Sequence, residues 1–189
     1  MRWDSEEHDT NPPIKTNDTN KKRTSLEILL YWCHSRSFVI RVEKTMLIGE
    51  YTHTLDPKKR LSFPAKFRKE MGKKVVITRG LDACLFVYPM KEWERIARKI
   101  AELPLGQSDS RGFNRFLLAG AVESEVDGAG RVLIPDFLKT FADLKEKVIV
   151  AGMHTRVEIW DEGAWSAYKK RIEANADTLA EKLGDLGIL

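Results

Sequence analysis

One nine-residue pattern occurs twice in this chain, and that duplication constrains the fold more than any other feature. Residues 56–64 read DPKKRLSFP, and residues 127–135, which begin 71 positions later, read DGAGRVLIP. In both segments an arginine follows the aspartate by four residues, and a proline follows the arginine by four. Two copies at such a long spacing indicate a duplicated domain, because solenoid repeats are shorter and more numerous.

Both copies are expected to begin in the same way. Alternating residues predict a strand before each motif, and a short apolar run after the arginine predicts a return strand. We therefore expect each copy to start as a β-hairpin whose tip ends at the arginine. Asp56 and Asp127 are expected to stabilise the turns, since aspartate bonds to its own downstream amides. Pro64 and Pro135 suit the first position of a helix, where a missing amide hydrogen costs nothing.

The later parts of the two copies also correspond, as a short helix, two strands and an amphipathic helix. One copy of about 70 residues buries little surface alone, so we expect both to share one β core about an approximate two-fold axis. The sequence thus predicts an α+β fold of two pseudo-two-fold repeats, at residues 46–118 and 119–189. The expected strands are 48–55, 61–63, 74–78, 85–88, 121–126, 132–134, 147–151 and 156–160, and the expected helices are 65–71, 136–144, 109–118, 176–186 and those starting at 89 and 161.

Residues 1–45 have no counterpart in the second copy. Residues 1–25 are polar and poor in apolar groups, which favours disorder. Residues 26–42 are more apolar, but charged residues interrupt them, which argues against a membrane span. We expect the functional protein to begin at or near Met46, with residues 1–45 a disordered or spurious extension. A translated regulatory arm is the alternative.

The positive charge is concentrated in the first copy. Nine basic residues lie between positions 57 and 79 against the single acid Glu70, whereas the matching stretch 128–150 has four basic and three acidic residues. Two isolated cysteines and four histidines without ligand spacing argue against a disulfide framework and a metal site, and they fit the cytoplasm. We expect no cofactor and no small-molecule substrate.

Arg60 and Arg131 are the candidate contacts to nucleic acid. Arginine presents a planar fork of donors that matches phosphate oxygens or the O6 and N7 acceptors of guanine, where a bidentate contact is worth about 1 to 3 kcal/mol. Lys58 and Lys59 would add salt-sensitive phosphate contacts. The alternative is that aspartate and arginine only lock the turn. The charge of the first copy favours nucleic-acid contact for Arg60, whereas both interpretations stay open for Arg131.

The two motifs, together with the segment MLIGEY at 46–51, resemble the MraZ family of bacterial transcriptional regulators. The likeness runs from Met46 to Leu189 and implies a double-split β-barrel of the AbrB and MazE-like superfamily that assembles as a ring-shaped homo-oligomer. It also implies repression, in the cytoplasm and nucleoid, of its own operon and the division and cell-wall gene cluster, through tandem DNA boxes. The family's DNA contact falls on Arg60, with Lys58, Lys59, Arg68 and Arg131 in support. The first copy departs from the family pattern, because it lacks the glycines that the second has at 128 and 130.

Two other classes of function compete with this one. Paired aspartates in related loops also describe an aspartic-protease dyad, but Lys58, Lys59 and Arg60 would keep Asp56 ionised, and we expect no enzyme. The stronger alternative is an antitoxin-like protein-interaction module, in which a C-terminal helix at 175–186 binds a protein partner. Apolar residues between the copies and near the C-terminus are interpreted mainly as packing within the chain, with subunit contact as the alternative; they are Phe113, Phe116, Leu117, Leu179, Leu183 and Leu186.

Overall fold

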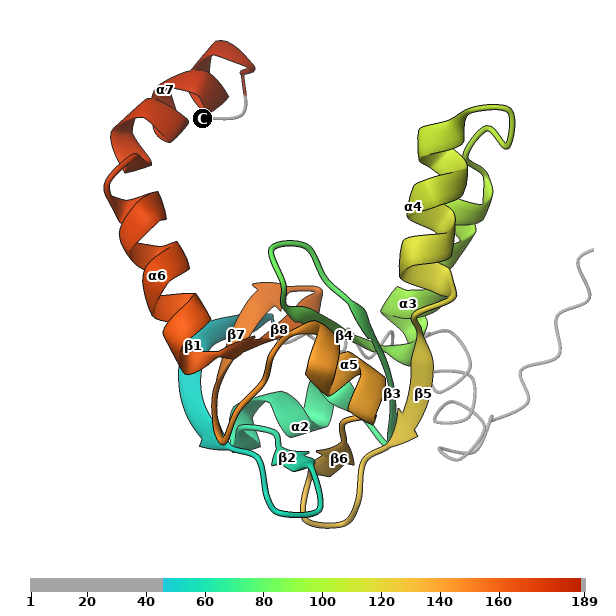
Figure 1. Cartoon of the computed structure of the whole chain (residues 1–189), viewed down its shortest axis with the longest axis vertical. Helices are drawn as coiled ribbons and strands as arrows, with labels where there is room; N and C mark the ends of the chain where they lie inside the picture. Colours follow the sequence, from blue (N-terminus) through green and yellow to red (C-terminus); the bar gives the residue numbers. More distant parts are fainter. Residues whose placement is uncertain (1–45, 188–189) are drawn as a thin grey trace, which may run out of the picture. The chain divides into compact units, whose positions relative to one another are not determined.

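The structure, a computed structural model, describes residues 46–187 (Figure 1). The expectations for residues 1–45 lie outside this range. The described chain mixes strands and helices in the order predicted. The strands are β1 (Leu47–Thr54), β2 (Arg60–Ser62), β3 (Lys74–Arg79), β4 (Leu85–Pro89), β5 (Val122–Glu125), β6 (Arg131–Leu133), β7 (Lys147–His154) and β8 (Arg156–Asp161). The helices are α2 (Ala65–Met71), α3 (Met90–Ala101), α4 (Ser108–Leu118), α5 (Asp136–Phe141), α6 (Glu162–Glu173) and α7 (Ala176–Asp185).

The strands form two antiparallel sheets that join the two copies. One sheet has the order β1-β7-β8-β4-β3-β5, and β2 pairs with β6 in a separate two-stranded ribbon. Each strand of this sheet has a counterpart in the other copy, β1 with β5, β3 with β7 and β4 with β8. When every strand is replaced by its counterpart, the strand order is reversed; for example, β1 pairs with β7 as β5 pairs with β3. The six-stranded sheet is open, with β1 and β5 at its edges. The pseudo-two-fold relation between the repeats is therefore visible in the pairing itself.

The predicted hairpins at the start of each copy are wrong. The turns themselves are tight, since the Asp56 amide donates to the Arg60 carbonyl at 3.0 Å and the Asp127 amide to the Arg131 carbonyl at 2.9 Å. However, the strands before and after each turn enter different sheets. Pairing β2 with β6 places Leu61 against Val132, both fully buried, so apolar burial between the copies replaces the local ladder.

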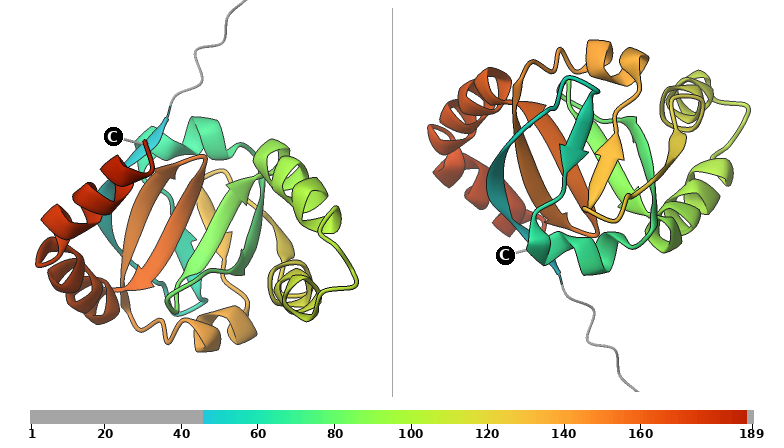
Figure 2. Two further views of the ribbon diagram at one scale, coloured as in Figure 1. Left: turned by 90° about the horizontal axis from the view of Figure 1, so that it is seen from above. Right: turned by 90° about the horizontal axis from the view of Figure 1, so that it is seen from below.

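One hydrophobic core lies between the larger sheet and the ribbon. It contains side chains of both copies, including Phe63, Phe67 and Ile134, and α2 and α5 close its two sides (Figure 2). The four inner strands of the larger sheet are buried on both faces, as a sheet covered on both sides requires. The edge strand β5 alternates between half-buried and exposed residues, as does the second half of β1.

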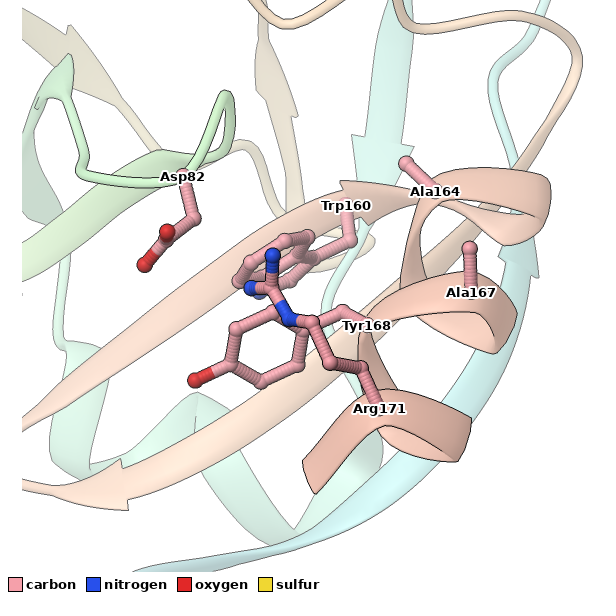
Figure 3. A pocket seen from close by; sticks show the side chains of 6 residues that line it. All are labelled: Asp82, Trp160, Ala164, Ala167, Tyr168 and Arg171. Atoms are coloured by element: carbon pink, nitrogen blue, oxygen red, sulfur yellow. The ribbon is translucent and has the colours of Figure 1, made fainter. Parts of the chain in front are cut away.

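A second apolar cluster covers the opposite face of the larger sheet. Helices α3, α4 and α6 pack there on aromatic residues of β4 and β8. Leu117 is buried, and Phe116 lies edge-on to Phe141 with ring centroids 5.8 Å apart, so both pack within the chain. Phe113 is exposed, and α7 contains no buried residue. Figure 3 shows a pocket next to α6, in which the Arg171 side chain lies over the Tyr168 ring beside Trp160, with Asp82 on another side of the pocket.

Pro64 and Pro135 lie one position earlier than predicted. Each is the residue immediately before its helix, with φ of −51° and −59°, and α2 and α5 begin at the next residue. Helix α5 ends at Phe141, three residues before the predicted end at 144. Among residues 46–187, no helix combines the length and the apolar character needed to cross a membrane.

Candidate nucleic-acid interface

The β2–β6 ribbon has one buried and one exposed face. Leu61 and Val132 are opposite each other in register and form the buried face. Their strand neighbours point the other way, because successive side chains of a strand alternate. Directly opposed residues share a face. The outer face therefore carries two cross-strand pairs, Arg60 with Leu133 and Ser62 with Arg131. The two arginines occupy one diagonal of this face.

Each of these arginines is held by the aspartate of its own turn. In the first turn, Asp56 Oδ1 accepts from the Arg60 amide at 2.8 Å, and Oδ2 accepts from Nε and Nη2 at 2.7 Å each. In the second, the corresponding distances between Asp127 and Arg131 are 2.9, 2.8 and 2.8 Å. The backbone hydrogen bond, followed by the guanidinium, lowers the pKa of each aspartate below its ordinary value. Both carboxylates are therefore ionised at neutral pH.

The arginines remain accessible although they are paired. The Arg60 side chain is 32% exposed and that of Arg131 is 38% exposed. In the part of the chain that the structure describes, Nη1 of both arginines makes no hydrogen bond. Lys58 is exposed at the turn beside Arg60. In Figure 1 both turns lie at the lower end of the coloured part of the chain, residues 46–187, away from α3, α4, α6 and α7. Two oriented guanidinium groups are thus available on one surface.

The two turns use different residues at the same left-handed position. Lys59 has φ of 61°, and Gly130, which is 71 residues later, has φ of 79°. The backbone of a residue other than glycine is strained in this region. The Lys59 ammonium forms an ion pair with Asp136 of the second copy. At Gly130 the space that a side chain would need is filled, because an added Cβ would lie 2.6 Å from Cδ of Arg68.

Arg68 belongs to the first copy but lies on the turn of the second. Its Nε donates to the Phe63 carbonyl at 3.0 Å, and its Nη2 donates to Ser62 Oγ at 3.3 Å. It lines a cleft of about 520 Å³ together with Asp127 and Gly130. Part of its donor capacity is therefore used inside the protein. Its charge nevertheless stands beside the second arginine turn.

Lys139 is a site residue that the sequence reasoning missed. It follows Arg68 by 71 positions, and it lines a second cleft, of about 360 Å³, beside the first turn. Applying the repeat spacing to Arg68 would have found it. Each cleft is lined by three cations and two acids, namely Arg68, Lys73, Lys74, Glu125 and Asp127 in one and Lys59, Lys139, Lys145, Asp56 and Glu146 in the other.

No metal site accompanies the turns. Within residues 46–187, no group of three or more histidine, cysteine, aspartate or glutamate side chains is arranged to hold an ion. The site consists of two guanidinium groups on a ribbon, two carboxylates that orient them and surrounding cations. Such a surface can bind an anionic partner and offer it hydrogen-bond donors in a fixed arrangement.

Comparison with known proteins also finds two copies of one unit in this chain. The family model described as "MraZ protein, putative antitoxin-like" matches twice, at residues 46–116 and 117–186. Each match contains one aspartate–arginine turn. Proteins named transcriptional regulator MraZ from Thermoanaerobacter sp. (strain X514) and Caldanaerobacter subterraneus subsp. tengcongensis are each 50% identical to this chain over 143 residues. The protein of that name from Moorella thermoacetica is 48% identical over the same length.

These alignments cover 76% of this chain and 100% of each of the three relatives. The relatives are named as regulators of transcription and not as enzymes. A duplicated motif, two matched copies and half-identical full-length relatives agree, and the chain belongs to the MraZ family.

Proposed function

We propose that this protein is a sequence-specific DNA-binding transcriptional regulator that contacts double-stranded DNA through the outer face of the β2–β6 ribbon. The observation that carries the proposal is the pair of partly exposed arginines, Arg60 and Arg131, each oriented by an aspartate on one shared surface. The names of the relatives support the same class of function.

The arrangement suits base recognition in the major groove. A guanidinium already fixed by a carboxylate loses less conformational freedom on binding than a mobile one. Diagonal positions on an antiparallel pair are about 7 to 8 Å apart, which corresponds to about two base steps of 3.4 Å. The two arginines can therefore address nearby bases, with O6 and N7 of guanine as the matching acceptors.

The surrounding cations suit the phosphate backbone. Lys58, Lys59, Arg68 and Lys139 lie in or beside the two turns. Contacts of this kind position a protein on DNA without reading sequence, and they weaken as salt is added. Arg60 and Arg131 are therefore proposed as specificity contacts, and the lysines and Arg68 as affinity contacts.

The finer proposal concerns targets and assembly. We propose a repressor of its own operon and of the division and cell-wall genes, acting in the nucleoid on tandem upstream boxes as a ring-shaped homo-oligomer. Several weak sites that engage adjacent boxes gain affinity through effective concentration. We also propose that the open sheet and the ribbon together form a double-split β-barrel, since one hydrophobic core joins them.

The antitoxin-like alternative rests on α7. This helix exposes Leu179 and Leu183 on a surface that nothing in residues 46–187 covers, as an arm that holds a protein partner would. Truncation after residue 174 separates the two functions. A module for a protein partner loses that partner while the affinity of each ribbon for DNA is unchanged, whereas the proposed regulator loses DNA affinity in parallel with its assembly state.

A salt titration of DNA binding tests the proposal. Fluorescence anisotropy would measure binding to a duplex from upstream of the protein's own gene, for wild type, Arg60→Ala and Arg131→Ala. Each substitution is expected to weaken binding by about 1 to 3 kcal/mol and to relax specificity. Arg98→Ala on α3, an exposed arginine far from the ribbon in sequence, is the matched control. Binding by both turn variants that equals wild type at every salt concentration refutes the assigned site.

A further inference from the structure

The outer face of the ribbon departs from the pseudo-two-fold symmetry at one position. Arg60 and Arg131 are related by the 71-residue spacing, but their cross-strand neighbours Ser62 and Leu133, related by the same spacing, differ in chemistry. Leu133 is 54% exposed, whereas its strand neighbour Val132 is fully buried. Core packing therefore does not account for the leucine. It occupies the outer face, directly opposite Arg60.

The same change recurs at the next related pair. Lys66 in the first copy corresponds to Phe137 in the second, and Phe137 is 46% exposed. The second copy thus replaces a polar and a cationic side chain by two apolar ones on its solvent-facing side. Of the two, Leu133 lies on the outer face of the ribbon itself, so its exposed apolar area faces whatever the ribbon binds.

The charges around Leu133 identify the partner. Arg60 lies opposite it and Arg131 is two positions earlier on the same strand, and each is paired with the aspartate of its own turn. An apolar protein partner would have to desolvate both ion pairs, whereas DNA offers phosphate and base acceptors to the guanidinium N–H groups that remain free within residues 46–187. The apolar group that DNA presents at its base edges is the C5 methyl of thymine in the major groove.

We infer that Leu133 is a second specificity-determining residue, which packs on the C5 methyl group of a thymine next to the base that Arg60 contacts. This inference rests on the proposed function. It also predicts that the protein binds its DNA site in one orientation. Two symmetry-related arginines alone fit DNA equally well in either orientation, whereas a leucine on one diagonal position and a serine on the other distinguish the two ends of the bound sequence.

The test removes the methyl groups without changing base pairing. The upstream duplex is prepared once with thymidine and once with deoxyuridine throughout, and binding by the full chain is measured on both. Wild type is expected to bind the deoxyuridine duplex about four-fold more weakly for each methyl group that packs on a leucine, the affinity ratio that corresponds to burying one such group. Leu133→Ser is expected to bind the two duplexes with nearly equal affinity.

The controls separate a methyl contact from other effects. Leu105→Ser replaces another exposed leucine, in the α3–α4 loop, and should keep the preference for thymidine. A preference that persists in Leu133→Ser would arise from altered DNA shape and overturns the inference, as does equal binding of both duplexes by wild type. Arg60→Ala in the same titration reports on the proposed function. If Arg60→Ala binds DNA as tightly as wild type, the proposed interface itself is refuted. If Arg60→Ala weakens binding but wild type binds both duplexes equally, only the role of Leu133 is refuted.

Discussion

The packing of the second turn can be tested directly at Gly130. It has φ of +79°, and a methyl group added there would lie 2.6 Å from Cδ and 2.9 Å from Cζ of Arg68. Gly130→Ala therefore places a side chain on a residue in the left-handed region, which costs about 1 to 2 kcal/mol of folding free energy. It also displaces Arg68 from its hydrogen bonds to Phe63 and Ser62, which contribute about 0.5 to 1.5 kcal/mol each.

The net effect on stability follows from these opposing contributions. Replacing glycine by alanine restricts the unfolded chain and returns about 0.4 to 1 kcal/mol. Gly130→Ala should therefore destabilise the protein by about 1 to 4.5 kcal/mol, which lowers the thermal unfolding midpoint by about 3 to 15 °C for a domain of this size. Urea denaturation monitored by tryptophan fluorescence measures the change in unfolding free energy directly.

Two further variants isolate the cause. Gly128→Ala changes the same turn, but an added Cβ there meets nothing within 4 Å, so its effect should stay within about 0.5 kcal/mol. In an Arg68→Ala background, Gly130→Ala should retain only the net backbone cost, at most about 1.6 kcal/mol. If Gly130→Ala is no more damaging than Gly128→Ala, or is unaffected by removal of the Arg68 side chain, the described packing of this turn is incorrect.

Two more predictions concern the stability of the protein at low pH and the difference in burial between the two faces of the ribbon. Because the folded-state pKa of Asp56 and Asp127 is lowered from 3.8, the stability that they add is complete above that value and is lost as pH falls through the lower folded pKa. Thermal midpoints followed between about pH 6 and pH 2.5 should thus fall more steeply in wild type than in the double Asp→Asn variant, and parallel curves would contradict this. Leu61→Ala should cost about 2 to 5 kcal/mol of unfolding free energy because the side chain is fully buried, whereas Leu133→Ala should cost no more than about 0.5 kcal/mol, and equal losses in urea denaturation would rule out the two-faced ribbon.

Local chemistry makes the candidate site visible in the amino-acid sequence. The spacing from Asp56 to Arg60 is that of a tight turn, and its recurrence at Asp127 and Arg131 marks the site twice. Such a turn closes within five residues, so side-chain and backbone bonds between near neighbours decide it. Hydrophobic alternation and helix-compatible prolines likewise placed most strands and helices close to their observed bounds.

Contacts between distant segments were decided by the tertiary structure. Nothing in residues 48–63 distinguishes a hairpin from two strands that leave for different sheets, because both arrangements satisfy the same alternation. The choice depends on what lies opposite, and Leu61 is buried by Val132 of the other copy. Arg68 and Lys139 show the same limit, since each stands beside the turn of the copy to which it does not belong.

The sequence by itself therefore determined the duplication, the order of the elements, the two aspartate–arginine turns and the family, since these depend on residues near one another in the chain. The tertiary structure decided that the turns meet on one ribbon, that Arg60 faces Leu133 and Arg131 faces Ser62, and that each cleft combines residues from both copies. The physical reason is that apolar residues of one copy alone bury too little surface, so the copies exchange strands around a common core, and only that exchange sets which side chains become neighbours.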